Sequence, residues 1–206
     1  MPFYPTLADF IEARQAEYDD IPENRKLLLG QLAQYIQSQK GEAPKVSLNF
    51  ICTHNSRRSH LSQIWAATAA AFYGVVGVQT FSGGTEATTF HPNAVAALKR
   101  AGFDIQNPGG KNPHYRVRFS NASPEIESFS KVYDDPFNPD KHFVAIMTCS
   151  DADENCPFIP GAAFRLALTY EDPKIADGTP REAEKYDATV RQISRELLYA
   201  FSLIQA

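Results

Sequence analysis

Apolar residues follow one spacing before residue 45 and another after it. In the first part they recur every three to four positions, as in helices with one buried face, and one such group comprises Leu28, Leu29, Leu32, Ala33 and Ile36. Residues 39–45 are mostly polar and contain glycine and proline, which predicts a linker. We therefore expect a helical N-terminal extension, residues 1–44, followed by a main domain, residues 45–206.

The main domain alternates short apolar runs with amphipathic segments. The apolar runs predict four strands, at residues 46–51, 78–84, 143–149 and 165–173. The amphipathic segments predict helices at residues 60–73, 91–101 and 181–206. Strands that alternate with helices are connected by right-handed crossovers and form a mostly parallel sheet. The pattern therefore predicts an α/β fold, with an open, mostly parallel four-stranded sheet flanked by helices.

Residues 109–141 interrupt this alternation. The stretches "HYRVRFSN" and "EIESFSKVYDD" alternate polar and apolar positions, which predicts an inserted β-hairpin that we interpret as a flap. Such a flap is equally compatible with the rim of a site, a dimer surface or a decorated sheet edge. The aromatic residues available for these roles are Tyr115, Phe119, Phe129 and Tyr133.

Composition narrows the class of protein. The 206 residues are 43% apolar and 21% charged, as in soluble globular domains. A net charge of −4 without a basic run argues against nucleic acid as a partner, and no apolar stretch is long enough to span a membrane. The N-terminus lacks the basic and apolar regions of a signal peptide. We therefore expect a cytoplasmic protein, and its oligomeric state stays open.

The three cysteines are Cys52, Cys149 and Cys156, an odd number that does not suit a framework of structural disulfides. In a reducing compartment they are thiols, and any disulfide among them is catalytic or transient. Cys52 and Cys149 each lie at the end of a predicted strand, and so does Asp172. Because the carboxyl ends of parallel strands form one edge of a sheet, we expect these three side chains to share a site.

The stretch "CTHNSRRS", residues 52–59, connects a predicted strand to a predicted helix. Backbone N–H groups at a helix N-terminus bind anions, and Arg58 adds a planar fork that grips two oxygens of a tetrahedral oxyanion. The same positive field favours the thiolate form of Cys52, which is then a nucleophile. The alternative is a small buried thiol beside a chance arginine. Candidate oxyanion-binding residues are Thr53, His54, Asn55, Ser56, Arg57 and Ser59.

This loop resembles the phosphate-binding loop of the low-molecular-weight protein tyrosine phosphatases and their relatives, the thioredoxin-linked arsenate reductases. The "EDP" stretch matches the family's general acid, which implies that role for Asp172 beside catalytic Cys52 and Arg58. The resemblance covers residues 46–107 and 142–206, and it implies the low-molecular-weight phosphatase fold. It covers neither the helical extension nor the inserted hairpin.

A second motif, "CSDADENCP", resembles the resolving cysteine pair of the arsenate reductases. The resemblance implies that Cys52 attacks arsenate, that Cys149 and Cys156 then carry a disulfide outward, and that thioredoxin reduces it. We expect the polar segment between the two thiols to be mobile. A zinc site is the alternative, but C-x6-C is wider than the usual zinc spacing and the nearby ligands are carboxylates. A thiol site that merely captures arsenite would not need Arg58 or Asp172.

A phosphatase is the competing interpretation, because arsenate and phosphate share shape and charge. In that case Cys52, Arg58 and Asp172 hydrolyse a phosphomonoester, and the other two thiols only protect Cys52 by reversible oxidation. Lys174 stands where tyrosine phosphatases carry aromatic residues, which argues against a phosphotyrosine protein substrate. We expect no metal and no other cofactor. Gln63 replaces a glutamate of potassium-binding relatives, which argues against a cation site near Asn55 and Ser82.

Overall fold

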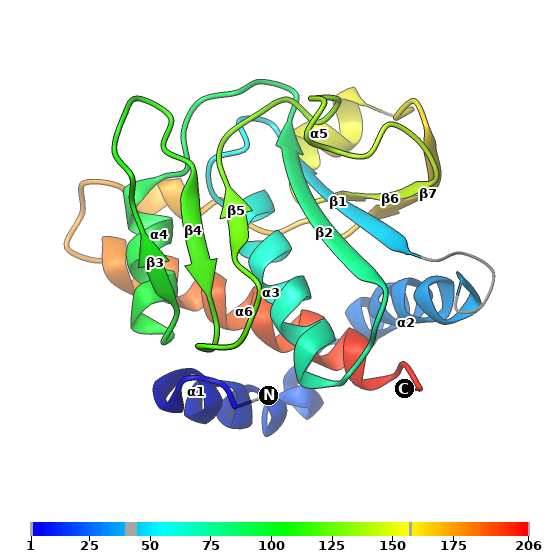
Figure 1. Ribbon diagram of the computed structural model, residues 1–206, viewed down its shortest axis with the longest axis horizontal. Coiled ribbons are helices and arrows are strands. Elements are labelled where there is room, and N and C mark those ends of the chain that lie inside the picture. Colours follow the sequence, from blue (N-terminus) through cyan, green and yellow to red (C-terminus); the bar gives the residue numbers. More distant parts are fainter. Residues whose placement is uncertain (1, 40–44, 157, 206) are drawn as a thin grey trace.

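The computed structural model describes residues 2–39, 45–156 and 158–205, so most of the expected linker lies outside the described residues. Its larger sheet contains β1 (Val46–Cys52), β2 (Val78–Gly84), β6 (Phe143–Met147) and β7 (Ala162–Ala167). The strand order is β2-β1-β6-β7 and every neighbouring pair is parallel, which confirms the predicted four-stranded parallel sheet (Figure 1). β7 begins earlier than predicted and leaves residues 168–172 as a loop.

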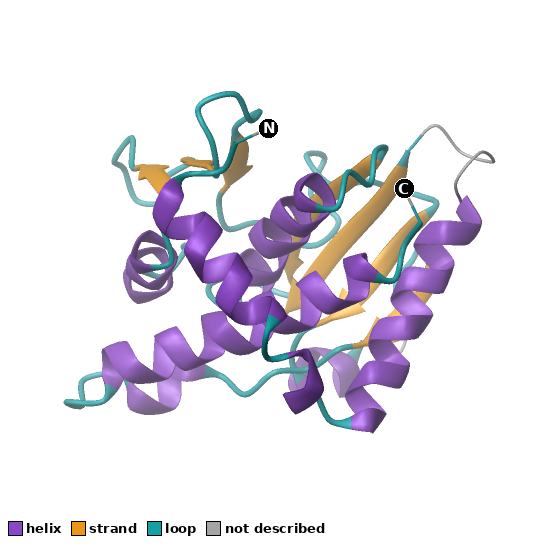
Figure 2. Ribbon diagram, turned by 90° about the horizontal axis from the view of Figure 1, so that it is seen from below, coloured by secondary structure: helices purple, strands orange, loops and turns teal. Residues whose placement is uncertain are grey.

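Helices cover one face of this sheet. They include α3 (Arg58–Phe72), which follows β1, and α6 (Glu182–Ser202), and both lie in front of the strands in Figure 2. The long α6 buries apolar residues at helical spacing, among them Val190, Ile193, Leu197 and Phe201, against sheet residues such as Leu48, Phe50 and Ile146. The shorter α4 (Pro92–Arg100) packs against α6 with its own apolar side. This main core holds the helices against one face of the sheet.

The N-terminal extension completes the same core. Helices α1 (Pro5–Gln15) and α2 (Glu23–Gln39) both pack against α6, with a short 3-10 helix, η1 (Tyr18–Asp20), between them. Their buried side chains join the main core, and they are Leu7, Ile11, Leu29, Leu32, Ala33 and Ile36. Arg25 of α2 donates a hydrogen bond of 2.5 Å to the buried carboxylate of Glu196. The extension is therefore continuous with the main domain in its packing.

The inserted segment forms a small sheet of its own. β4 (Tyr115–Arg118) and β5 (Ile126–Ser128) pair antiparallel, which confirms the predicted hairpin. A third strand, β3 (Asp104–Gln106), pairs with β4 and lies before the predicted start of the insertion at residue 109. Three residues are too few to show a periodic pattern, so β3 escaped prediction. The rings of Tyr115, Phe119 and Phe129 are buried, so these three do not form a rim.

The other face of the large sheet carries a second, smaller core. It contains Ile51, Cys52, Met147, Cys149, Ala152 and Ile159, with Tyr133, Cys156 and Ala162 packed at its border. Ala152 belongs to α5 (Ser150–Asn155), the helix directly after β6. All three cysteines of the chain therefore gather on one face of one sheet. Among the described residues, no helix has the length and apolar character needed to cross a membrane.

Candidate active site

The loop between β1 and α3 is shaped by close contacts with the end of β2. Asn55 has φ of 43°, in the left-handed region that asparagine tolerates better than most residues. The backbone N–H groups of Thr85 and Glu86 donate to the carbonyls of Cys52 and Thr53, at 3.1 and 2.8 Å. A Cβ atom on Gly84 would lie 2.7 Å from the Asn55 nitrogen. Glycine at this position lets the two backbones approach and hold the loop.

Cys52 is buried at the start of this loop, and its sulfur has one polar neighbour of known geometry. The Cys52 Sγ lies 3.1 Å from Ser59 Oγ, while Asn55 Nδ2 donates to the same Ser59 oxygen at 2.8 Å. Because Ser59 Oγ accepts from Asn55, its own proton is available to the sulfur. Asn55 and Ser59 thus form a hydrogen-bonded chain that ends at the Cys52 sulfur.

The inserted segment is tied to the loop through Lys131. Its backbone N–H donates to Asn55 Oδ1 at 2.9 Å, and the neighbouring Ser130 Oγ donates to the His54 carbonyl at 3.2 Å. The Lys131 ammonium is itself buried against Phe129 and Phe137. Burial lowers the pKa of Lys131 to about 8, against opposing carboxylates that raise it. Sequence analysis missed this residue, because nothing in the local pattern places residue 131 beside residue 55.

Arg58 and Asp172 meet directly. Arg58 is the first residue of α3, and its Nη2 donates to Asp172 Oδ2 at 2.6 Å while its Nη1 donates to the Tyr170 carbonyl at 2.9 Å. Asp172 lies after β7 and caps a 3-10 helix, η2 (Pro173–Ala176), by accepting from the Lys174 N–H at 3.0 Å. The predicted guanidinium clamp and the predicted general acid therefore lie side by side.

A second arginine is held by a separate network. Arg57 Nε donates to Tyr186 Oη at 2.6 Å, and Arg57 Nη2 donates to Asp177 Oδ2 at 2.8 Å. Tyr186 Oη in turn donates to Asp177 Oδ1 at 2.7 Å. Burial raises the pKa of Tyr186 to about 12, so the phenol stays protonated at neutral pH and keeps this bond. Sequence analysis did not find Tyr186 or Asp177, which lie more than a hundred residues beyond the loop.

These groups surround a small pocket at the carboxyl edge of the sheet. Its lining residues are Cys52, His54, Ser56, Arg57, Arg58 and Asp172. Two guanidinium groups, a thiol and a carboxylate around one small space can bind a tetrahedral oxyanion and attack its central atom. The remaining predicted residues, Thr53, Asn55 and Ser59, belong to the same loop but do not line the pocket. Thr53 Oγ1 instead lies 3.5 Å from the Cys149 sulfur.

The other two thiols lie at opposite ends of α5. Cys149 is fully buried and caps the helix, its Sγ accepting from the Ala152 N–H at 3.4 Å. Cys156 lies at the other end of the helix and is only half-buried. The segment between them, expected to be mobile, is helical here, because each of its ends is held by hydrogen bonds. The structure therefore places Cys52, Arg58 and Asp172 around one pocket. It places Cys52, Cys149 and Cys156 in one apolar cluster, with α5 as an additional element.

A buried polar network lies behind the loop. Ser82 Oγ donates to Gln63 Oε1 at 2.7 Å, and Gln63 Nε2 donates to the Thr80 carbonyl at 3.2 Å. His60 Nδ1 lies 3.2 Å from Ser82 Oγ, and burial lowers the pKa of His60 well below its usual value. Gln63 and Ser82 thus have hydrogen-bond partners within the protein. Within residues 2–39, 45–156 and 158–205, no cluster of three His, Cys, Asp or Glu side chains is arranged to hold a metal ion.

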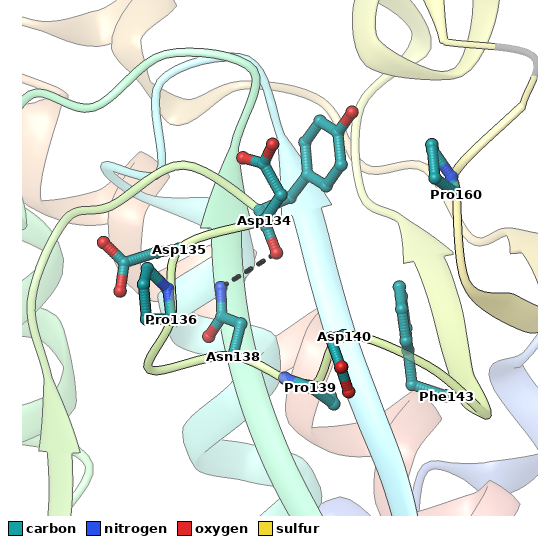
Figure 3. A pocket seen from close by; sticks show the side chains of 9 residues that line it. Asp134, Asp135, Pro136, Asn138, Pro139, Asp140, Phe143 and Pro160 are labelled. Carbon is teal, nitrogen blue, oxygen red and sulfur yellow. Dashed lines mark hydrogen bonds between the residues drawn. The ribbon is translucent and has the colours of Figure 1, made fainter.

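A separate pocket lies beside the second core (Figure 3). Residues 133–136 and 138–140 of the inserted segment line one side of it, and Phe143 and Pro160 line the other. Asn138 Nδ2 donates to the Tyr133 carbonyl at 3.2 Å and steadies the inserted segment there. This pocket shares no residue with the oxyanion pocket, so we do not assign it to the reaction.

The parallel sheet, with a cysteine and an arginine six residues apart in the loop after β1, defines a low-molecular-weight phosphatase-like enzyme. Within that class, the chain belongs to the arsenate reductase family. It is 32% identical to the arsenate reductase of Bacillus subtilis (strain 168) over 142 residues, which cover 69% of this chain and 84% of that protein. It is 29% identical to the arsenate reductase of Bacillus licheniformis over 158 residues, 77% of this chain and 96% of that one.

Two solved structures align with the chain at low sequence identity. A low-molecular-weight phosphotyrosine phosphatase from Vibrio cholerae O395 aligns with a TM-score of 0.49 at 16% identity, covering 75% of this chain and 93% of that one. An arsenate reductase in a phosphate-binding state aligns with a TM-score of 0.47 at 17% identity, covering 78% of this chain and 99% of that one. No protein-family model matches the chain.

Proposed function

We propose that the chain reduces arsenate to arsenite with a relay of three thiols, and that thioredoxin restores the reduced enzyme. The observation that supports this best is the shared packing of Cys52, Cys149 and Cys156 in the small second core. A phosphatase needs only the first of these thiols. A reductase needs two electrons, which a pair of thiols supplies when it becomes a disulfide.

The first step forms a bond between sulfur and arsenic. Arsenate enters the pocket, replaces the Asp172 carboxylate on Arg58, and is held by the loop N–H groups and the two guanidinium groups. The Cys52 thiolate attacks the arsenic atom. Asp172, freed from its 2.6 Å contact with Arg58, takes a proton from water. It passes this proton to one oxygen on arsenic, and that oxygen leaves as water.

The second step is the reduction. The Cys149 thiolate attacks Cys52 Sγ, the sulfur–arsenic bond breaks, and its electron pair stays on arsenic, which leaves as arsenite. One disulfide, Cys52–Cys149, has formed, and arsenic has gained two electrons. The 3.5 Å contact between Thr53 Oγ1 and Cys149 Sγ supports this step, because Cys149 lies directly beside the loop.

The third step moves the disulfide outward. The Cys156 thiolate attacks Cys149 Sγ, and Cys52 leaves as a thiolate, so the step is an exchange without net redox change. Cys149 and Cys156 flank the six-residue α5 and are seven positions apart. At the rise of a helix their Cα atoms lie about 10 Å apart, whereas a disulfide needs about 6 Å. Helix α5 must therefore unwind before Cys149 and Cys156 can bond. Cys156 is half-buried while Cys149 is fully buried, which favours attack by thioredoxin on Cys156.

The decisive assay follows NADPH loss with arsenate, thioredoxin and thioredoxin reductase. We expect arsenate-dependent turnover that Cys149→Ser and Cys156→Ser each abolish, while both variants keep the fold. If only Cys52→Ser lost turnover and both other serine variants stayed active, the result would contradict the relay. Because the relay needs reduced thiols, we place the protein in the cytoplasm.

Phosphomonoester hydrolysis is the second candidate. A neighbouring pocket shares Arg57 and Asp172 with the oxyanion pocket and also contains Lys174 and Ile175. This space would take the organic group of an ester whose phosphate sits in the loop, and Asp172 would protonate the leaving oxygen. Hydrolysis of p-nitrophenyl phosphate that requires Cys52 but neither other thiol, with no arsenate turnover, would support the phosphatase instead.

We also propose that residues 45–206 carry the reaction and that residues 1–44 serve stability. The helices of the extension bury apolar side chains against α6 and contribute no residue to the oxyanion pocket. Removal of residues 1–39 should therefore lower the melting temperature strongly. A truncated chain that melted like the full one would contradict this assignment.

A further inference from the structure

The carboxyl end of α5 is held by a side chain from β7. Arg165 Nη2 donates to the Asp153 carbonyl at 2.8 Å and to the Cys156 carbonyl at 3.2 Å. The same guanidinium forms an ion pair of 2.6 Å with the Asp153 carboxylate. Among the described residues, no other side chain from outside α5 hydrogen-bonds this end of the helix. One arginine thus bridges the last turn of α5 and the backbone of the third thiol.

The register of the sheet places Arg165 on the same face as the thiols. Arg165 pairs in register with Ala145 of β6, and Ala145 belongs to the second core. Neighbouring residues in register point to the same face of a sheet, so Arg165 reaches the face on which the cysteines lie. Six residues make a helix that is not stable alone in water, and its last carbonyls lack partners within the helix. Arg165 supplies partners for two carbonyls at that end.

We propose that Arg165 is a positioning residue that holds α5 in its helical form and thereby limits how fast Cys156 reaches Cys149. This inference rests on the proposed relay, because only the third step requires α5 to unwind. In that step the Cys156 thiolate bonds to Cys149 Sγ, the Cys52–Cys149 bond breaks, and Cys52 leaves with the electron pair. Arg165 takes no part in the bond changes. It keeps the thiols apart until the exchange begins.

The test is a single turnover without thioredoxin. Reduced protein is mixed with arsenate, quenched with acid, alkylated and mapped by mass spectrometry, so that the Cys52–Cys149 and Cys149–Cys156 disulfides are counted separately. Arg165→Met should convert the first disulfide to the second about tenfold faster, because charge-assisted hydrogen bonds no longer hold the helix. Arg165→Lys, which keeps the charge, should convert the first disulfide at a rate between those of the unaltered chain and Arg165→Met. The rate of forming Cys52–Cys149 should not change.

Two further measurements separate positioning from simple charge effects. The conversion is followed from about pH 7 to about pH 10, because an effect of charge on Cys156 ionisation disappears once the thiol is fully ionised, whereas an effect on α5 persists. Hydrogen exchange of the α5 amides should quicken about tenfold in Arg165→Met, at an unchanged melting temperature. Arg100→Met, which removes an exposed arginine paired with Asp187, is the control and should match the unaltered chain.

The outcomes are distinguishable. Equal conversion rates in the unaltered chain and Arg165→Met, or slower conversion in the variant at high pH, would overturn the role of Arg165 and leave the relay intact. Absence of both the Cys52–Cys149 and the Cys149–Cys156 disulfide after arsenate treatment of the unaltered chain would overturn the proposed relay itself. The exchange measurement needs no arsenate, so unchanged α5 protection in Arg165→Met would overturn the holding role in either case.

Discussion

The Arg58 guanidinium and the Asp172 carboxylate lie 2.6 Å apart, so the proposed clamp for the oxyanion and the proposed acid for the leaving oxygen bind each other. An incoming oxyanion competes with Asp172 for the same Nη2 donor. Asp172 is mostly buried at this contact, and the ion pair is therefore stronger than one at a free surface. In the proposed mechanism, substrate binding and release of the acid are thus one coupled event.

Replacement of Asp172 separates the two halves of this event. Asp172→Asn should lower arsenate turnover about 100-fold, because the amide cannot donate a proton as an acid does. The same variant should bind inorganic phosphate about tenfold more tightly, because Arg58 loses its competing charge. Steady-state kinetics and calorimetry measure the two effects. Asp187→Asn, at an exposed ion pair with Arg100, is the matched control and should change neither.

Removal of the Tyr186 hydroxyl should act on binding more than on chemistry. Tyr186 Oη accepts from Arg57 Nε at 2.6 Å and holds that guanidinium at the pocket. In Tyr186→Phe we expect KM for arsenate to rise about fivefold while kcat stays within about twofold, because Arg57 contributes charge but no proton. Equal losses in kcat and kcat/KM would instead assign Arg57 a role confined to the transition state.

Asn55 should be essential to the loop. It has φ of 43°, donates to Ser59 and accepts from the Lys131 N–H, all while fully buried. Asn55→Ala should lower the free energy of unfolding by about 2 to 4 kcal/mol, because it leaves a buried donor unpaired and places an ordinary residue in the left-handed region. Urea denaturation checks this value. Asn93→Ala, on the surface of α4, should cost much less, and similar losses in both would contradict our account.

Lys131 should make stability depend on pH above neutrality. Burial lowers its pKa to about 8 in the folded chain, with Asp135 and Glu127 opposing the shift, whereas an unfolded lysine titrates near 10.5. Between these values the unfolded chain holds a proton that the folded chain has released. Unfolding then takes up a proton, so stability rises with pH across this window, by about 3 kcal/mol in total.

The measurement compares the unaltered chain with Lys131→Met by urea denaturation at several pH values. Other titrating groups cancel in the difference between the two chains. We expect the free energy of unfolding of the unaltered chain to rise relative to that of Lys131→Met as pH rises from about 8 to about 10.5. A constant difference would show that Lys131 titrates normally in the folded state.

Much of the fold was predictable because its signals are local. The strands at Val46–Cys52 and Phe143–Met147 are uninterrupted apolar runs, and α6 buries one side at helical spacing. The hairpin of β4 and β5 shows period-two alternation. β3 was missed because three residues carry no period, and α5 was missed because a polar six-residue segment has no apolar stripe. Cys149 caps the start of α5, and Arg165 of β7 hydrogen-bonds its end. Neither residue belongs to the six-residue segment itself.

The sequence by itself determined the chemistry of the oxyanion loop. The residues from Cys52 to Ser59 are contiguous, and a loop between a strand and a helix positions them through its own backbone. Cys149 and Asp172 were also recognisable as site candidates, since each lies at the end of a predicted strand and parallel strands end at one edge. The pairing of Cys149 with Cys156 was suggested by the resemblance to the arsenate reductases. These features follow from local backbone geometry and from the parallel arrangement of the strands.

Only the tertiary structure decided which side chains complete that site. The partners of Arg57, the support of Asn55 by Lys131 and the hold of Arg165 on α5 join residues far apart in the chain. Such contacts depend on how the insertion, the edge strand and α6 pack, and packing responds to the summed shape of the core rather than to any local pattern. The reactive groups are therefore written in the sequence, while their orientation and restraint arise from the packed fold.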